Sequence, residues 1–218
     1  MSNDAPPLGI VMLDTAFPRP PGDIGNPASF PFPVFYDTVP SATVRRIVGS
    51  QPDPALLAPF VAAGHRLIGR GCARITTSCG FLVLWQAPLA QALAVPVLAS
   101  SLLILPRLPD AGVLTFDPAL LGAAHLAAAG ANVATPVEGL QREDSLYRTI
   151  AEDRAELDQA VAQGEVIAAG RRLLRRAPRI SSIVLECTNF GPYRAALAMA
   201  LGLPVHGIVE ALIDPAFQ

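Results

Sequence analysis

The segment Ile75–Val97, ITTSCGFLVLWQAPLAQALAVPV, returns 108 residues later as Ile183–Val205, IVLECTNFGPYRAALAMALGLPV. Nine of the 23 aligned positions are identical, whereas an alanine-rich composition of this kind would give about two identities by chance. The identical positions include a cysteine in each copy, Cys79 and Cys187. A repeat of about half the chain length indicates two duplicated domains and not a solenoid of short repeats.

The beginnings of the two halves also agree. GIVMLD at residues 9–14 matches GVLTFD at residues 112–117, and the offset of 103 means that the halves differ by only a few residues. We therefore expect an N-terminal half over residues 1–103 and a C-terminal half over residues 104–205. The remaining segment, residues 206–218, is expected to pack back on the N-terminal half.

Within each half, short apolar runs alternate with longer amphipathic stretches, which is typical of parallel sheets covered by helices. The expected strands are residues 9–13, 34–39, 74–78, 95–99, 112–116 and 180–186. The expected helices are residues 54–68 and 118–129 and one or two helices within 143–176, broken at Gly164 and Gly170, with Leu146, Ile150, Leu157, Val161 and Leu173 facing inward. The fold class is thus α/β, with two pseudo-symmetric domains. Each has a mostly parallel central sheet flanked by helices, and the active site is expected in the cleft between them.

The composition excludes several function classes. All 16 basic residues are arginine, and the chain of 218 residues contains no lysine. Pyridoxal phosphate is normally held as a lysine Schiff base, and the usual P-loop needs its lysine on the terminal phosphates, so neither is expected. A net charge of −2 gives no electrostatic footprint for a nucleic-acid partner. The three cysteines lack the close spacing of a structural zinc site, and we expect neither a metal nor a cofactor.

The sequence contains no targeting pattern. Residues 1–8 have neither the basic region nor the apolar core of a secretory signal, and three cysteines fit a reducing compartment, so a cytoplasmic location is expected. The uncharged stretch between Arg74 and Arg107 is interrupted by prolines and glutamines, so it is interpreted as soluble structure and not as a membrane span. The expected partner is a small carboxylate substrate, and a homo-oligomer is left open.

A loop rich in proline and glycine follows the first expected strand. Residues 15–33 contain the run FPRPPGDIGNPASFPFP, whose pattern favours no regular element. Loops of this length in compact domains are often functional. Whether this loop closes over the cleft is left open at this stage.

The two repeat-equivalent cysteines each follow a strand. Ligands of open parallel sheets bind outside the carboxyl ends of the strands, and a pseudo-twofold axis would place Cys79 and Cys187 on opposite walls of one cleft. Inverting a carbon next to a carboxylate needs a base on one face and an acid on the other. A thiolate and a thiol suit these roles once the thiol pKa falls modestly from about 8.5. Cys72 precedes its strand and has no equivalent in the other half, so it is interpreted as structural.

Polar residues beside the two cysteines are candidates for binding the substrate. They are Thr77, Ser78 and Gly80 around the first cysteine and Thr188 and Asn189 after the second. Hydroxyl, amide and backbone N–H groups at such strand-to-helix turns hold carboxylates, and the glycine would let the backbone approach a ligand closely. Ordinary helix capping favours the same residue types equally well.

Asp14 and Asp117 recur at the end of the first strand of each half. They either orient a thiol or a ligand or cap the segment that follows, and the sequence does not decide between these roles. Of the three histidines, only His206 lies near the expected cleft, and no pattern supports it as a catalyst.

The motifs ITTSCGF and LECTNFGPY, each joining a strand to a helix in a duplicated α/β chain, resemble the aspartate/glutamate racemase superfamily. That group includes amino-acid and hydantoin racemases, and arylmalonate decarboxylases and maleate isomerases keep similar folds. The resemblance covers the whole chain in architecture and is specific at the two cysteine motifs. It implies that Cys79 and Cys187 are the two acid/base thiols, that Thr188 binds a carboxylate and that Asp14 is the acidic residue after the first strand.

The neighbours of the two cysteines depart from the pattern of that group. Many of its amino-acid racemases carry asparagine and threonine directly after the first cysteine, where this chain has Gly80 and Phe81. They also often carry histidine or glutamate two residues after the second cysteine, where this chain has Asn189. With Phe190 and Trp85 nearby, the pocket is expected to be more apolar than one made for aspartate or glutamate.

Three functions remain open at this stage. The leading hypothesis is a cofactor-independent isomerase, a racemase or epimerase that acts on the carbon next to a carboxylate or amide of an amino acid or related small substrate. The second is a single-cysteine decarboxylase or cis–trans isomerase of a small diacid, in which one cysteine substitution abolishes activity and the other weakens it. The third is a non-catalytic small-molecule binding protein, in which neither thiol has a depressed pKa.

Overall fold

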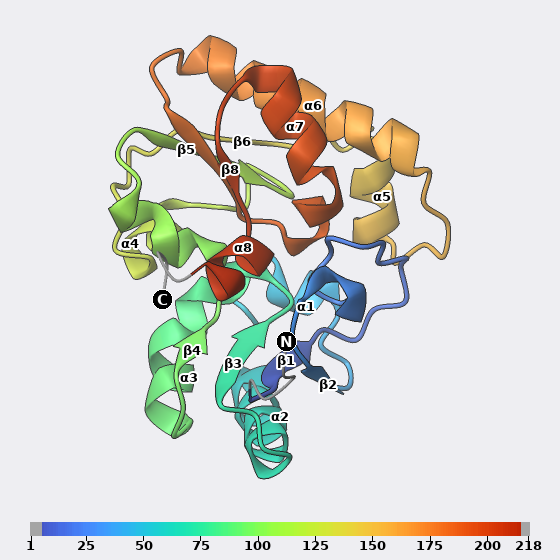
Figure 1. Ribbon diagram of the computed structural model, residues 1–218, viewed down its shortest axis with the longest axis vertical. Coiled ribbons are helices and arrows are strands. Elements are labelled where there is room, and N and C mark those ends of the chain that lie inside the picture. The colour runs from blue at the N-terminus through green and yellow to red at the C-terminus, as the bar shows by residue number, and fades with distance from the viewer. Residues whose placement is uncertain (1–5, 215–218) are drawn as a thin grey trace.

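The structure is a computed structural model that describes residues 6–214, and it consists of two halves with one parallel sheet each. The first sheet contains β1 (Leu8–Met12), β2 (Val34–Thr38), β3 (Arg74–Thr77) and β4 (Val97–Leu98) in the order β2-β1-β3-β4. The second contains β5 (Ala111–Thr115), β6 (Val137–Gly139), β7 (Ser182–Leu185) and β8 (Val205–His206) in the order β6-β5-β7-β8. In Figure 1 the first sheet lies in the lower part of the molecule and the second in the upper part. This arrangement confirms the expected α/β class.

The sequence repeat is also a repeat of strand pairing. Ile75 of β3 pairs with Val97 of β4, and 108 residues later Ile183 of β7 pairs with Val205 of β8. All pairs in both sheets are parallel, so the carboxyl ends of the strands in each half share one edge.

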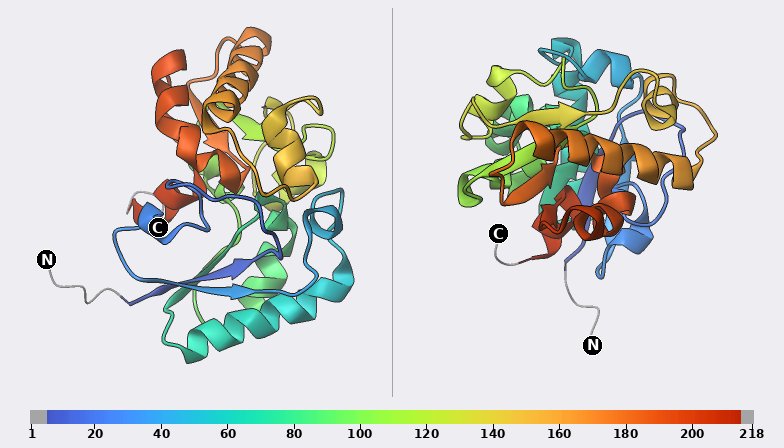
Figure 2. Two further views of the ribbon diagram at one scale, coloured as in Figure 1. Left: turned by 90° about the vertical axis from the view of Figure 1, so that its right-hand side faces the viewer. Right: turned by 90° about the horizontal axis from the view of Figure 1, so that it is seen from above.

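The helices cover the sheets and shape the junction between the halves. They are α1 (Val44–Ile47), α2 (Leu57–Gly69), α3 (Gln86–Ala92), α4 (Ala123–Ala128), α5 (Ser145–Ala151), α6 (Gln159–Arg176), α7 (Arg194–Leu201) and α8 (Ile208–Ile213). Single 3₁₀ segments are η1 (Pro27–Ser29), η2 (Pro54–Leu56), η3 (Gly80–Trp85), η4 (Ser101–Arg107) and η5 (Thr188–Tyr193). Figure 2 shows α2 below the first sheet and α6 and α7 over the second. None of the helices within the described range is both long and apolar enough to cross a membrane.

Several expectations for the second half were wrong. Gly164 and Gly170 do not break a helix, because both lie inside the continuous α6, and the chain leaves helical structure earlier, between α5 and α6. A Cβ at Gly170 would lie within 2.7 Å of Leu197 and 2.8 Å of Leu201, so this glycine allows α6 and α7 to pack closely. Val161 is 45% exposed and does not face inward.

Two boundaries in the second half also differ. The helix expected over residues 118–129 is helical only as α4, because Asp117 caps the turn at residues 118–121 through its hydrogen bond to the N–H of Ala119. The strand β6 was not expected at all, since its three residues are too few to give a period.

One hydrophobic core extends through both halves, and a smaller cluster lies beside it. In the smaller cluster, Ile208, Val209 and Leu212 of α8 pack against Leu8 and Ile10 of β1. Figure 1 shows α8 between the two sheets. The helix at the end of the described chain therefore lies on the first half and covers its sheet.

Candidate active site

Each of the two repeat-equivalent cysteines stands between a strand and a 3₁₀ segment. Cys79 follows β3 and precedes η3, whereas Cys187 follows β7 and precedes η5. The carbonyl of Cys79 accepts the N–H of Leu82 at 3.1 Å, and the carbonyl of Cys187 accepts the N–H of Phe190 at 3.1 Å. Both cysteines thus begin a 3₁₀ turn with the same hydrogen bond, and both stand at the carboxyl edge of their sheets.

Both cysteines line one cavity between the halves. The cavity has a volume of about 20 Å³, which is room for about one water molecule. Further lining residues come from both halves and include Phe17, Arg19, Phe81, Phe116, Glu186 and Asn189. Cys79 is 8% exposed and Cys187 is 6% exposed, so the site is nearly closed to solvent.

The two cysteine turns interlock across the junction. The hydroxyl of Thr188 donates to the carbonyl of Ser78 at 2.7 Å. Gly80 is the repeat equivalent of Thr188, and a Cβ at this glycine would collide with the carbonyl and the carboxylate of Glu186. A glycine is therefore needed at position 80, because the chain of the other half occupies the space of a side chain.

Glu186 is a buried acid directly before the second cysteine. It is 1% exposed, and its Oε2 accepts a hydrogen bond of 2.6 Å from the hydroxyl of Thr115. Burial raises the pKa of Glu186 to about 7, although hydrogen bonds from Thr115 and from the N–H of Phe116 act in the opposite direction. Its protonation state therefore changes near neutral pH.

Burial also raises the pKa of both thiols, and the carboxylate of Glu186 raises them further. At Cys79, the N–H groups of Phe81 and Leu82 and the charge of Arg19 act in the opposite direction. Both thiols are consequently protonated at neutral pH in the closed site. A base at this site needs a further positive charge or hydrogen-bond donor to become a thiolate.

A short chain of contacts connects Cys187 to the proline-rich loop. The thiol donates to Oδ1 of Asn189 at 3.7 Å, and Nδ2 of Asn189 donates to Asp23 at 2.7 Å. Asp23 is 1% exposed and forms an ion pair of 2.9 Å with Arg19. The loop thus helps to set the position of the second thiol.

The second half also holds the loop at its beginning. Oδ1 of Asp153 accepts the N–H of Ala16 at 2.7 Å and that of Phe17 at 3.0 Å. Figure 2 (left) shows the blue loop running from β1 along the junction between the halves. Phe17 and Arg19 of this loop therefore line the cavity, and the beginning of the loop is attached to the second half.

The structure brings most of the sequence-predicted site residues together. Ser78, Gly80, Thr188 and Asn189 line the cavity with the two cysteines. The side chain of Ser78 is already engaged, because its oxygen accepts the N–H of Leu13 at 2.9 Å.

Asp14 and Thr77 do not line the cavity. Asp14 is exposed and its carboxylate accepts the N–H of Ser41 at 2.8 Å. The hydroxyl of Thr77 donates to the carbonyl of Ala99 at 2.7 Å, and side chains alternate along a strand, so it points away from the side of Ser78. Both side chains are thus engaged outside the cavity, and their expected part in substrate binding stays a prediction.

The remaining candidates also lie outside the cavity. Asp117 accepts the N–H of Ala119 and the hydroxyl of Tyr147, both at 2.9 Å, which is a capping and bracing role. His206 lies half-buried in β8, and burial lowers its pKa. Cys72 is 3% exposed, and burial raises the pKa of its thiol.

Sequence reasoning missed two charged residues of the site, Glu186 and Arg19. Glu186 directly precedes the second cysteine motif, and an acid at the end of an apolar strand was the signal available. Arg19 lies in a loop whose length pointed to function, but nothing in the loop pattern assigns its contacts. Two of the five N–H donors of Arg19 are engaged by Asp23 and Thr15.

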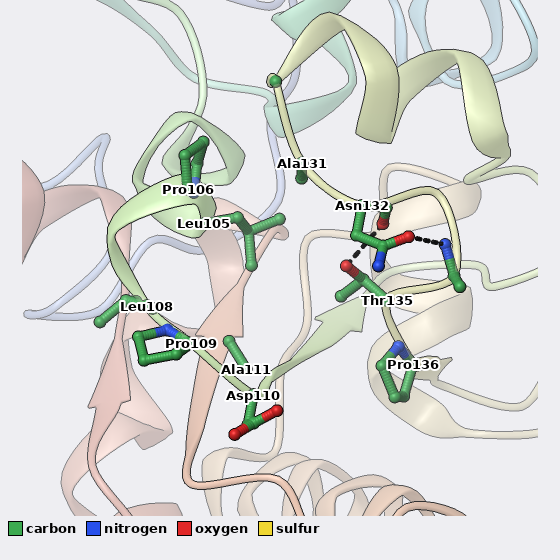
Figure 3. A pocket seen from close by; sticks show the side chains of 12 residues that line it. Leu105, Pro106, Leu108, Pro109, Asp110, Ala111, Ala131, Asn132, Thr135 and Pro136 are labelled. Carbon is green, nitrogen blue, oxygen red and sulfur yellow. Dashed lines mark hydrogen bonds between the residues drawn. The ribbon is translucent and has the colours of Figure 1, made fainter.

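A larger hollow of about 440 Å³ lies elsewhere, at the amino ends of β5 and β6 (Figure 3). Around it, the carbonyl of Asn132 accepts the hydroxyl of Thr135 at 2.6 Å and its side chain accepts the N–H of Ala134, while the carboxylate of Asp110 lies apart from these groups. None of the residues described around this hollow is a cysteine, histidine or arginine. The two cysteines, Glu186 and Arg19 line the other cavity instead.

In sequence, the chain is similar to several dimethylsulfoniopropionate lyases. The chain is 29% identical over 223 residues to a dimethylsulfoniopropionate lyase of Durusdinium sp. clade D, covering 96% of this chain and 73% of that protein. It is 30% identical over 217 residues to dimethylsulfoniopropionate lyase 3 of Emiliania huxleyi, covering 93% of this chain and 57% of that protein. No family model matches the sequence.

Solved structures of similar fold include a decarboxylase and racemases. Unliganded arylmalonate decarboxylase has a TM-score of 0.63 at 15% identity, covering 95% of this chain and 89% of that one. Allantoin racemase from Klebsiella pneumoniae has a TM-score of 0.59 at 16% identity, with coverages of 96% and 89%. A putative Asp/Glu racemase from Yersinia pestis has a TM-score of 0.55 at 13% identity, with coverages of 98% and 100%. The chain therefore has the fold of the aspartate/glutamate racemase superfamily, the group that its paired cysteine motifs resemble.

Proposed function

We propose that the protein is an enzyme that removes a proton next to a carboxylate and eliminates a leaving group from the adjacent carbon, as a dimethylsulfoniopropionate lyase. The observation that carries this proposal is the single closed cavity lined by two cysteines and Glu186. The names of the sequence relatives support elimination over the other reactions of this fold.

The reaction balances without any added reagent. A thiolate takes the proton from the carbon next to the carboxylate, and the electron pair of the broken C–H bond forms a carbon–carbon double bond. The bond between the β carbon and the sulfonium sulfur breaks, and dimethyl sulfide leaves with the electron pair of this carbon–sulfur bond. The products are acrylate, dimethyl sulfide and one proton, which the thiol carries until solvent takes it.

The positive charge of the substrate favours formation of the thiolate. Burial and Glu186 raise the pKa of both thiols in the closed site. A sulfonium group has a fixed positive charge, and placing it beside the thiols favours their deprotonated form. A dicarboxylate would bring negative charge and favour the protonated thiols, so this site is better suited to a zwitterion.

Arg19 is the best-placed residue to bind the substrate carboxylate. Arg19 lines the cavity, and its side chain is 12% exposed. Arginine binds carboxylates through paired N–H groups, and a nearby cation stabilises the charge that develops when the α proton leaves. Because Arg19 belongs to the proline-rich loop, closing that loop would complete the binding site.

Racemisation or epimerisation is the second candidate, favoured by the repeat-equivalent positions of Cys79 and Cys187. It begins with the same proton removal next to a carboxylate or amide, and the other thiol then returns a proton to the opposite face. Loss of carbon dioxide, the reaction named for arylmalonate decarboxylase, reaches a similar carbanion by another route.

The test is direct incubation of the purified protein with dimethylsulfoniopropionate. We expect dimethyl sulfide in the headspace, measured by gas chromatography, and an equal amount of acrylate, measured by proton NMR. If neither product forms, the elimination proposal is wrong. In that case, exchange of the α-hydrogen of allantoin or aspartate for deuterium in D₂O tests the racemase candidate.

Cysteine variants separate the two candidates. Elimination uses one thiol as base, so Cys79→Ser and Cys187→Ser should differ, with one losing about 10²- to 10⁴-fold in kcat/KM and the other less. Racemisation predicts that both lose racemase activity. Cys72→Ala is the matched control, because this buried cysteine lies outside the cavity, and it should keep the wild-type rate.

A further inference from the structure

The acid in the cavity wall has no cation to balance it. None of the ion pairs among the described residues includes Glu186, although it is 1% exposed. The hydroxyl of Thr115 bonds to one of its oxygens, and the other lies against Gly80. A buried carboxylate without a counter-ion is costly even when it accepts hydrogen bonds, here from Thr115 and the N–H of Phe116, so a ligand that supplies a positive charge would be stabilised here.

The charged side chains that line the cavity come from different halves of the molecule. Arg19 comes from the loop of the first half, and Glu186 comes from the end of β7 in the second half. Phe17, Phe81 and Phe116 line the same cavity. Aromatic rings bind sulfonium and quaternary ammonium groups through their negative faces.

We propose that Glu186 is the cation-recognising residue of this site, and that it selects small zwitterions whose fixed positive charge lies two carbons from a carboxylate. This inference rests on the proposed function for the identity of the substrate. It does not depend on catalysis, because it concerns binding. Glu186 then acts on specificity by holding the onium group of the ligand, while Arg19 holds its carboxylate.

The groups that face Glu186 make the binding dependent on pH. They are the thiols of Cys79 and Cys187 and the hydroxyl of Thr115, and the more distant Asp23 is already paired with Arg19. The pKa of Glu186 is raised to about 7 by burial, so its carboxyl group is partly protonated near neutrality. A bound cation favours the ionised form, and binding should therefore release a proton at pH 7.

Two probe ligands of the same shape differ only in the positive charge, so comparing them measures its contribution to binding. 3-(Trimethylammonio)propanoate carries a fixed cation and a poor leaving group, and 4,4-dimethylpentanoate replaces the nitrogen with carbon. Isothermal titration calorimetry at pH 8 should show that the wild-type protein binds the ammonium compound roughly 10- to 100-fold more tightly, as expected for a charge-assisted contact. At pH 7, titration in buffers of different ionisation enthalpy should show proton release with the ammonium compound alone.

Glu186→Gln should abolish this preference and the proton release while leaving the affinity for 4,4-dimethylpentanoate unchanged. Glu186→Asp keeps the charge and should keep the preference, whereas Glu156→Gln, at an exposed position, is the control for an unrelated loss of charge. Equal binding of the two probes by the wild-type protein, no measurable binding of the ammonium compound, or a preference that persists in Glu186→Gln would each overturn the inference. Absence of dimethyl sulfide production with this selectivity intact would instead count against the proposed reaction alone.

Discussion

The hydroxyl of Thr188 donates to the carbonyl of Ser78 at 2.7 Å, and this bond ties the turn that carries Cys187 to the turn that carries Cys79. Thr188→Val removes the donor and leaves a buried carbonyl without that partner. We expect a loss of about 1–3 kcal/mol in the free energy of unfolding. Urea denaturation measures it, and kcat for dimethyl sulfide release should fall as well.

Thr188→Ser is the matched control, because it keeps the hydroxyl and should keep both the stability and the rate close to wild type. Wild-type behaviour of Thr188→Val would show that the bond does not set the spacing of the turns. If Thr188→Val instead weakened carboxylate binding at unchanged stability, the ligand role implied by the family resemblance would be favoured.

The repeat explains why the fold was predictable from the sequence. A duplication that matches Ile75 with Ile183 and Val97 with Val205 also fixes which strands pair, and the structure has these pairs. The role of Gly170 could not be predicted from the sequence, since a glycine within a helical segment either weakens the helix or lets a neighbouring helix pack closely against it. Only the position of Leu197 on the packed α7 decides between these outcomes.

The site was predictable where it depended on local sequence and not where it depended on contacts between halves. The repeat marked Cys79 and Cys187 as a pair, and the cavity contains both. Thr77 and Ser78 are adjacent and polar, so composition alone could not tell which one faces the cavity. Arg19 reaches the site through a folded loop, whose path is set by the distant Asp153.

Gly80 should tolerate no side chain. A Cβ at this position would collide with Glu186, whose backbone carbonyl is held in place by the strand before it. Gly80→Ala should therefore lower the free energy of unfolding by about 1–3 kcal/mol through overpacking. Elimination activity should fall with it, because the shift moves the cysteine turns apart.

Gly164→Ala provides the contrast for this substitution. Gly164 lies inside α6, and nothing lies within 4 Å of the Cβ that an alanine would add. Alanine should stabilise the helix by roughly 0.5–1 kcal/mol. Thermal unfolding of both variants provides the comparison, and a neutral or stabilising Gly80→Ala would contradict the close approach.

Asp153 should control how the proline-rich loop opens. The closed cavity of about 20 Å³ holds roughly one water molecule, so a substrate the size of dimethylsulfoniopropionate enters only when a covering segment moves. Asp153→Ala removes the acceptor for two N–H groups of the loop. Hydrogen exchange at residues 15–33 should become faster, and KM should rise because ordering the loop costs more free energy.

Glu152→Ala is the control for the loop, because this neighbouring exposed residue forms its ion pair with Arg154 and not with the loop as far as the structure describes it. It should leave loop exchange and KM unchanged. Slower or unaltered exchange in Asp153→Ala would mean that the attachment lies elsewhere, for example at the contact of Asp23 with Asn189.

The buried acid should also reveal itself in the stability of the unliganded protein. Folding raises the pKa of Glu186 from its ordinary 4.5 to about 7, so the native state binds this proton more tightly than the unfolded state. A raised pKa contributes stability that is complete below pH 4.5 and is lost as the pH rises through 7. The loss amounts to about 3 kcal/mol, since each pKa unit corresponds to about 1.4 kcal/mol.

The amide of Glu186→Gln cannot ionise, so this variant does not lose stability as the pH rises. Its free energy of unfolding should exceed that of the wild type by up to about 3 kcal/mol above pH 8, and the difference should shrink toward pH 4. Urea denaturation at both pH values measures it, with Glu156→Gln as the exposed control that should show no such gain. A gain that did not depend on pH would point to better packing of the amide, whereas no gain at pH 8 would mean that the wild-type carboxylate is already stabilised in the cavity. In that second case the wall would not need a cation from a ligand, and the preference for zwitterions would have to come from the aromatic rings alone.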